Sequence, residues 1–148
     1  MGIREWRRES QYDHIIMKKL ISKEDHIFVP GRSGMVGSSI HRNLIEKGYG
    51  VEKIGGKISI PSRSELDLLS YSQVYNWFKS NKPNVVIIAA AKVGGIRANS
   101  SYPADFILEN LKIQTNLIEI SWRFKVKRLL FLGSSCIYPK YAEQPLKE

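Results

Sequence analysis

The sequence lacks the features that mark secreted, membrane-embedded and disulfide-stabilised proteins. Cys136 is the one cysteine among 148 residues, so no internal disulfide forms, and such usage is typical of a reducing cytoplasm. No apolar run approaches the roughly 20 residues of a membrane span. The polar first 25 residues contain no apolar core of signal-peptide length. We therefore expect a cytoplasmic protein without membrane attachment.

Acidic residues are also scarce, because 14 Asp and Glu stand against 23 Lys and Arg, which gives a formal net charge of +9. Such a balance raises nucleic acid as a possible partner. The basic residues are spread out, however, and the sequence has no aromatic and basic interleaving, no zinc-ligand spacing and no helix-turn-helix pattern. We expect no specific nucleic-acid binding and no metal site. A solvated basic surface that also suits an anionic nucleotide explains the charge better.

The most informative stretch is a strand, a glycine turn and a helix in direct succession. The apolar run Ile27–Val29 leads into Gly31, Gly34 and Gly37, and apolar residues then recur at helical spacing in Ser38–Lys47. Three glycines at this spacing permit a tight turn, a close approach of backbone to a pyrophosphate and close packing of helix on strand. The pattern predicts the start of a dinucleotide-binding unit, with phosphates at the helix N-terminus.

Strands and helices alternate in the rest of the chain, which predicts an α/β fold with a doubly wound parallel sheet. The spacing of apolar residues is equally compatible with Val51–Ile54 and with Lys57–Ile60 as the second strand. The unbroken apolar run Val85–Ala91 is typical of a strand buried on both faces. The further elements that we expect are a helix over Tyr71–Ser80 capped by Ser70, a loop over Lys92–Ser101, a helix from Pro103 to about Trp122–Phe124 and a strand over Arg128–Leu132.

The expected sheet is incomplete on its C-terminal side. A doubly wound sheet usually has six or more strands, whereas this sequence provides about four. The fourth strand would then be an apolar edge without a neighbour, and exposed edges of this kind promote association. We assign residues 26–148 to a partial dinucleotide-binding domain and residues 1–25 to a polar N-terminal extension, which includes a possible short helix around Ile15–Ile21.

Ligands of open α/β sheets bind beyond the carboxyl ends of the strands. Three stretches there carry chemistry: PGRSGMVG, AAAKVGG and GSSCIYP. An acidic residue after the second strand would favour NAD, but this chain has Arg63 there and Arg32 in the glycine turn. A guanidinium suits the 2′-phosphate of NADP because it forms paired charged hydrogen bonds. Asp67 lies where it can reach the adenine edge.

Four segments together resemble the GDP-L-fucose synthases, which are NADPH-dependent epimerase/reductases of the extended short-chain dehydrogenase/reductase family. These segments are GRSGMVGSSI, SRSELDLL, AAAKVGGIRANSSYPADFI and LLFLGSSCIYPK. The resemblance implies that Ser134 hydrogen-bonds the C4 oxygen of the substrate and that Cys136 takes part in the epimerisations. It implies NADP(H) as cofactor, a GDP-sugar substrate and a homodimer for a complete protein. The residues that it places at the cofactor are Gly31, Arg32, Ser33, Gly34, Met35, Val36, Gly37, Arg63, Ser64, Glu65, Leu66, Asp67, Leu68, Ala90, Ala91, Lys92, Leu132, Gly133, Ser134 and Ser135.

The sequence also departs from this family. Ser33 stands where an arginine is usual. The family's Tyr-x-x-x-Lys pair is expected some two dozen residues after Cys136, beyond Glu148, and Tyr138 and Tyr141 have no lysine four positions later. We therefore expect the N-terminal, cofactor-binding portion of such an enzyme, without the substrate domain and inactive alone. The alternatives are a truncated gene product that at most binds NADP(H), and a 4,6-dehydratase or 4-epimerase of the same family, although those enzymes usually lack the cysteine.

Overall fold

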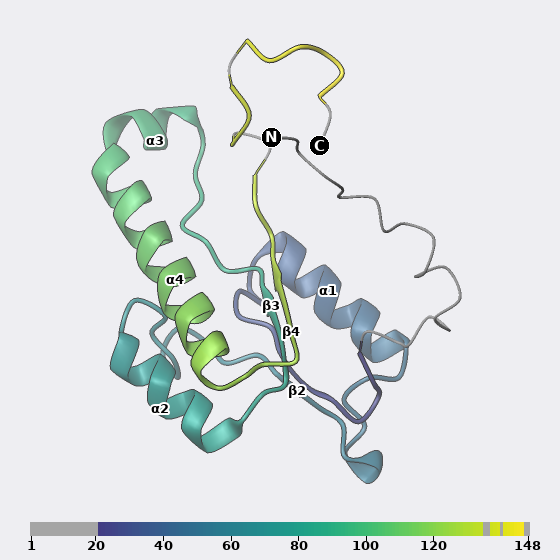
Figure 1. The fold of residues 1–148 in the computed structure, drawn as a ribbon. Helices are drawn as coiled ribbons and strands as arrows, with labels where there is room; N and C mark the ends of the chain where they lie inside the picture. The colour runs from purple at the N-terminus through teal and green to yellow at the C-terminus, as the bar shows by residue number, and fades with distance from the viewer. Residues whose placement is uncertain (1–20, 135–136, 140, 147–148) are drawn as a thin grey trace, which may run out of the picture.

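The computed structural model describes residues 21–134, 137–139 and 141–146, and it forms a four-stranded sheet with helices on both faces (Figure 1). All strand pairs are parallel, and the strand order is β2-β1-β3-β4. The strands are β1 (His26–Phe28), β2 (Lys57–Ser59), β3 (Val85–Ile88) and β4 (Arg128–Phe131). The helices are α1 (Met35–Glu46), the 3-10 turn η1 (Glu52–Ile54), α2 (Tyr71–Asn81), α3 (Ile96–Ser101) and α4 (Pro103–Arg123). The predicted α/β class and parallel sheet are confirmed.

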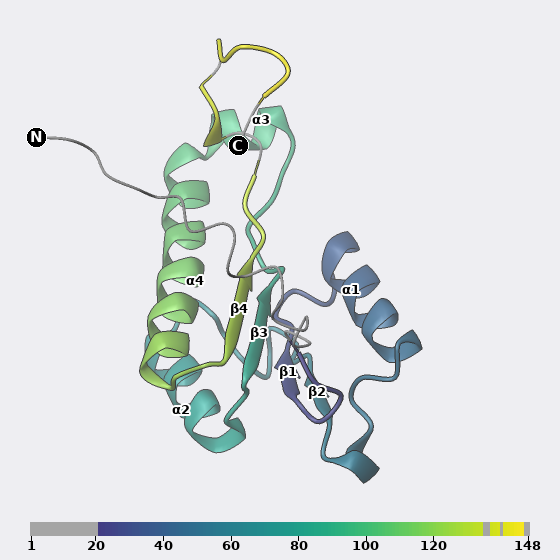
Figure 2. The ribbon, with the colours of Figure 1, turned by 45° about the vertical axis from the view of Figure 1, so that its right-hand side comes forward.

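The two central strands supply a core on each face of the sheet, because successive side chains of a strand point to opposite faces. One core lies under α2 and α4 and the other under α1, and Figure 2 shows these helices on opposite sides of the sheet. The side chains under α2 and α4 are Phe28, Val86 and Ile88, and those under α1 are Ile27, Val29, Val85 and Ile87. The apolar runs at 27–29 and 85–88 therefore have the predicted cause, whereas residues 89–91 lie beyond β3, are not buried and line the pocket described below.

The second strand is the later of the two candidates. Residues Glu52–Ile54 form η1 instead, which ends at Gly55 with a left-handed φ of 85°. Ile27 of β1 pairs with Ile58 of β2, and Ile58 and Ile60 pack against the core under α1. The pairing partner therefore decides the position of β2, and local periodicity contains no information about it.

The two helices of the other face begin where the sequence predicts. The Ser70 hydroxyl accepts a hydrogen bond from the Gln73 N–H at 3.4 Å and caps α2. Pro103 occupies the first turn of α4, where its missing N–H has no intrahelical partner to lose. The expected loop over 92–101 is wrong in its second half, because Ile96–Ser101 forms α3. The Asn99 amide stabilises this short helix by donating to the carbonyls of Gly94 and Gly95.

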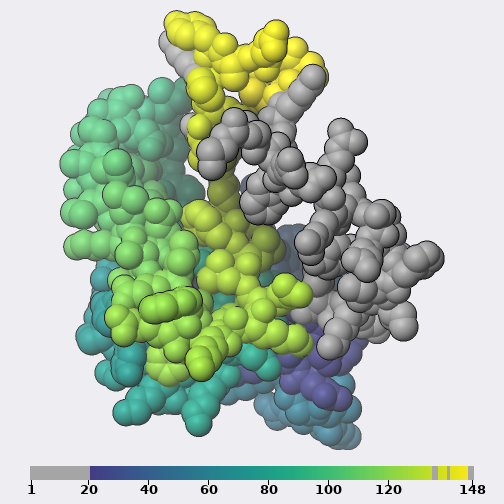
Figure 3. Space-filling view, viewed as in Figure 1, coloured from purple at the N-terminus to yellow at the C-terminus, as the bar shows by residue number. Residues whose placement is uncertain are grey.

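β4 forms one edge of the sheet and pairs with β3 alone. Its apolar side chains remain exposed, and Leu130 keeps 51% of its surface accessible. Figure 3 shows the yellow-green residues of this strand at the surface beside α4. The predicted apolar edge is confirmed within the described residues, while the domain boundary at residue 25 and the expected short helix stay predictions, since residues 1–20 lie outside the description.

Polar side chains form hydrogen bonds and an ion pair at the amino ends of the strands. The His26 ring donates from Nδ1 to the Asn81 carbonyl at 2.9 Å, and its Nε2 accepts from the Ser59 hydroxyl at 2.7 Å. Partial burial lowers the pKa of His26 below its ordinary 6.5, with the nearby Lys57 acting in the same direction. The buried Asp25 carboxylate forms an ion pair with Lys127, 3.0 Å away, which joins the entry of β1 to that of β4.

We predict that stability falls in mildly acidic solution through His26. Because the pKa is lowered in the fold, the unfolded chain takes up the proton first, so this contribution is complete above about pH 6.5 and decreases as the pH falls below that value. Denaturant unfolding of the wild type and of His26→Gln between pH 7.5 and 5.5 measures it. The wild type should lose stability relative to the variant, and parallel curves would contradict the prediction.

Candidate functional site

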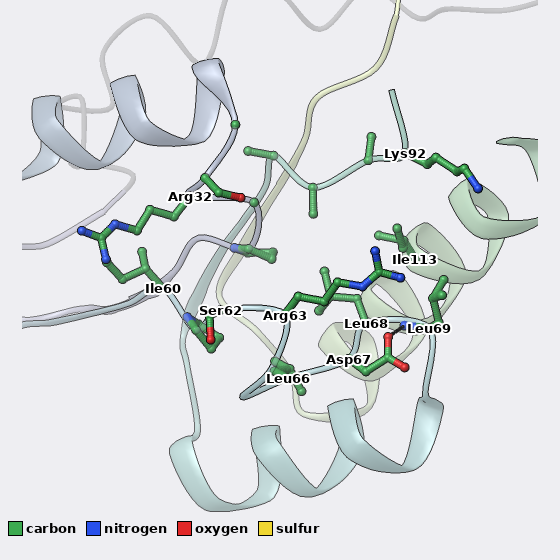
Figure 4. Close-up of a pocket in the computed structure, with 18 of the residues that line it drawn as sticks. Arg32, Ile60, Ser62, Arg63, Leu66, Asp67, Leu68, Leu69, Lys92 and Ile113 are labelled. Atoms are coloured by element: carbon green, nitrogen blue, oxygen red, sulfur yellow. Dashed lines mark hydrogen bonds between the residues drawn. The ribbon is translucent and has the colours of Figure 1, made fainter. Parts of the chain in front are cut away.

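A pocket of about 1280 Å³ opens at the carboxyl ends of β1 and β3 (Figure 4). The chain leaves β1 toward β2 on one side and later crosses to β3 on the other, so the pocket lies at the topological switch point of the sheet. Three segments supply most of its walls, namely residues 30–36 after β1, residues 60–69 after β2 and residues 89–93 after β3. Its volume exceeds the roughly 300–1,000 Å³ of common ligand clefts, which suits an extended ligand.

The floor of the pocket depends on two glycines. Gly31 has a φ of 97°, and a Cβ there would lie 2.5 Å from the Ala89 carbonyl carbon. Gly37 in α1 faces Gly31, and its Cβ would overlap the Gly31 carbonyl oxygen. The turn after β1 is therefore held in backbone contact with α1 on one side and with the segment after β3 on the other.

The N-terminus of α1 lines the pocket and has no side-chain cap. Gly34 is its N-cap and offers no side chain, so the first-turn N–H groups of Met35, Val36 and Gly37 have no carbonyl within the helix to bond. The first turn contains no acidic residue. Free N–H groups and the positive end of the helix dipole attract phosphate oxygens.

The pocket wall that follows β2 is stabilised by hydrogen bonds to the carboxylate of Glu65. Glu65 accepts hydrogen bonds from the N–H and the hydroxyl of Ser62, both at 2.7 Å, and these bonds lower the pKa of Glu65. Leu66 is buried in the core below. The turn between these anchors carries Arg63, whose side chain extends across the pocket toward Ile113 in Figure 4.

Both pocket arginines are exposed, and among the described residues neither forms a hydrogen bond or an ion pair. Arg32 points away from Arg63, toward Ile60, in Figure 4. Lys92 behaves differently, because its Nζ lies 2.6 Å from the Glu109 carboxylate of α4. The pocket therefore offers two unpaired guanidinium groups to an anionic ligand, while the ammonium group is already neutralised.

The structure brings together most of the predicted cofactor residues, since residues 31–36, 63–68 and 90–92 all line the pocket. Gly37 lies behind the lining and packs on the turn. Leu132, Gly133 and Ser134 follow β4 and do not line the pocket, and Ser135 and Cys136 lie outside the described residues. Sequence reasoning missed Glu109 and Ile113 of α4, which complete the wall. Their roles, and those of the predicted residues, stay predictions.

Two Tyr-x-x-x-Lys pairs do occur earlier in the sequence, at Tyr49–Lys53 and at Tyr75–Lys79. The structure places neither at the pocket. Tyr49 lies under the Lys23 ammonium at 4.3 Å, and Tyr75 packs edge-on against Phe124 at the end of α4. Neither pair is a candidate for the family's proton-donating couple.

Within the described ranges, no group of three or more His, Cys, Asp or Glu is arranged to hold a metal ion. None of the helices described by the structure combines the length and apolar character that crossing a membrane requires.

A family model described as "NAD dependent epimerase/dehydratase family" matches residues 27–148. The chain belongs to this family. The match includes every segment that lines the pocket, from the turn after β1 to α4.

Two curated members of the family show high similarity. A putative GDP-L-fucose synthase 2 of Arabidopsis thaliana is 52% identical over 129 residues, which is 87% of this chain and 38% of that protein. The GDP-L-fucose synthase of Escherichia coli K12 is 47% identical over 125 residues, which is 84% of this chain and 37% of that protein. The chain thus spans a little over a third of the length of these relatives.

A solved structure supports the same fold. The GDP-mannoheptose C4 reductase MlghC from Campylobacter jejuni, determined with NADP bound, superposes with a TM-score of 0.78 at 36% identity. The superposition covers 86% of this chain and 38% of that one. The four-stranded sheet is therefore Rossmann-like, as in that reductase, and it is incomplete relative to a doubly wound sheet of six strands.

We predict that Gly37→Ala destabilises the protein by about 1–3 kcal/mol, because the new methyl group overlaps the Gly31 carbonyl and must push α1 away from the turn. Thermal unfolding measures the effect, which should lower the Tm by several degrees. Gly95→Ala is the matched control, since its Cβ would meet no atom within 4 Å. Equal Tm values for the two variants would contradict the close-contact explanation.

Proposed function

We propose that this chain is the cofactor-binding part of an NADPH-dependent GDP-4-keto-6-deoxy-D-mannose 3,5-epimerase/4-reductase, the enzyme that forms GDP-L-fucose. The observation that carries the proposal is the pocket at the switch point, with an open helix N-terminus on one wall and Arg63 on another. The names of the similar relatives and the NADP of the C. jejuni reductase support this assignment.

The pocket residues fit NADP(H) in chemistry. The turn Gly31–Val36 would hold the pyrophosphate, since it leads into the N-terminus of α1, whose first-turn N–H groups lack helical partners. Arg63 would bind the 2′-phosphate, and Asp67 would face the adenine edge. Ser64, Glu65, Leu66 and Leu68 would shape the adenosine wall, and Ala90, Ala91 and Lys92 the opposite one.

NADPH, when bound, supplies a hydride to the C4 carbonyl of the sugar. Ser134 lies just beyond β4, next to β3 in the sheet, where its hydroxyl would donate to that carbonyl oxygen. Leu132, Gly133 and Ser135 would border the nicotinamide side. Cys136 would act in the proton exchanges at C3 and C5, which the neighbouring ketone makes acidic.

The outer side of α4 supports a homodimer of the complete protein. Ile107, Leu111, Ile118 and Trp122 are exposed there, at spacings of four, seven and four residues. This spacing is the same in both directions, so an antiparallel pair of these helices about a two-fold axis would place apolar residues opposite one another. The cytoplasmic location expected from the single cysteine stays a prediction.

We predict that Arg63 sets the preference for NADPH over NADH. Arg63→Ala should weaken NADPH binding by roughly 10- to 100-fold and leave NADH binding nearly unchanged, because charged hydrogen bonds to the 2′-phosphate are lost. Fluorescence titration with each cofactor measures both affinities. Arg97→Ala, an exposed arginine of α3 outside the pocket, is the matched control. Equal loss of both cofactors in Arg63→Ala would refute the assignment.

We also predict that the 148-residue chain alone does not reduce the keto sugar. The proton-donating pair and the sugar-binding domain expected from the family lie beyond Glu148, and positioned acid catalysis contributes about 10²–10⁴-fold. NADPH oxidation with GDP-4-keto-6-deoxymannose measures turnover, and the E. coli relative assayed in parallel shows that the assay works. Turnover above background by this chain would overturn the prediction.

A further inference from the structure

Two asparagines of α4 bind the backbone of both pocket walls. Asn110 brackets Lys92: its Nδ2 donates to the Lys92 carbonyl at 2.9 Å, and its Oδ1 accepts from the Lys92 N–H at 2.8 Å. Asn116 is buried, and its Nδ2 donates to the Leu68 carbonyl at 2.8 Å. Because the partners are backbone groups, each bond fixes the course of a loop and not the rotamer of a side chain.

These bonds are the polar links between α4 and the loops. Among the side-chain hydrogen bonds of the described residues, the Asn116 bond joins residues 61–69 to α4. The Asn110 pair and the Lys92–Glu109 ion pair join residues 89–93 to the same helix. The two asparagines are six residues apart, or about 9 Å along the helix. Ile113 lies midway and lines the pocket, with Lys92 on one side and Leu68 on the other in Figure 4.

We propose that α4 sets the width of the pocket, with Asn110 and Asn116 as positioning residues that hold its two walls apart at the distance a dinucleotide needs. The proposal rests on the proposed cofactor function. Neither asparagine lines the pocket, so neither contacts the ligand directly. Their effect is preorganisation, because a wall that is already in place need not be ordered when the ligand binds.

The two asparagines have different consequences for cofactor choice. The loop held by Asn116 carries Arg63, so releasing it displaces the guanidinium as well as the adenosine wall. The loop held by Asn110 carries Ala90, Ala91 and Lys92, and the Lys92 ammonium is already paired with Glu109, so this loop has no free charge to offer a 2′-phosphate. Loss of Asn116 should therefore lower the preference for NADPH, whereas loss of Asn110 should weaken NADPH and NADH by the same factor.

Titration of Asn116→Ala and Asn110→Ala with NADPH and NADH tests the proposal. Each variant should bind NADPH about tenfold more weakly, because a loop that has lost its bond to α4 must be ordered when the cofactor binds. Ser121→Ala is the matched control, because Ser121 is also buried on α4 and its Oγ has no hydrogen-bond partner in the described part of the chain. This control should keep the affinity and the preference of the wild type.

Amide hydrogen exchange of the cofactor-free wild type provides a second test, which needs no substituted protein and therefore does not depend on whether a variant folds. The Lys92 N–H should be protected without cofactor, since Asn110 already bonds it. A wild type that binds no NADPH overturns the proposed function. Two results would overturn this proposal alone, provided that the wild type binds NADPH. One is that the folded asparagine variants bind NADPH as tightly as Ser121→Ala does, and the other is that the Lys92 amide is unprotected.

Discussion

The structure depends on the backbone contact between Gly31, Gly37 and Ala89. At this point the end of β1, the first turn of α1 and the segment leaving β3 meet without any side chain between them. No residue with a Cβ satisfies the contact on both sides of the turn, and Gly31 also needs its left-handed φ. Because all three segments leave the same edge of the sheet, the close approach creates the pocket floor and directs the N-terminus of α1 into the pocket.

The parts of the fold that follow from local pattern could be predicted. The apolar runs at residues 27–29 and 85–88, the Ser70 cap and the periodicity of α4 are each properties of one segment, and the structure confirms them. The position of β2 could not be predicted, because its pairing with β1 decides between two equally good local candidates. The helix α3 was missed since its residues Asn99–Ser101 favour turns, and a bond from Asn99 to the preceding loop stabilises it.

The candidate site likewise has parts that a contiguous motif predicts and parts that only long-range packing determines. The glycine turn and the Arg63 turn are contiguous motifs, and both line the pocket. The contribution of α4 is not contiguous with either, because Glu109 and Ile113 reach the pocket only after the chain has crossed the sheet. The pairing of Lys92 with Glu109 has the same origin, since the partners are 17 residues apart and no short motif relates them. Long-range packing therefore determines which of the basic residues remain available to an anion.

The exposed edge of β4 has a consequence for biosynthesis in longer family members. In relatives of which this chain covers 37–38%, most of the polypeptide is translated after the segment described here. At the usual elongation rate of roughly 5–20 residues per second, the remainder takes on the order of ten seconds or more to emerge from the ribosome. During that time the apolar residues Leu129–Leu132 stay exposed, and the outer edge of β4 has no strand paired with it. A nascent chain that has already folded this unit would therefore present an edge strand able to pair with another chain, a state against which chaperones protect.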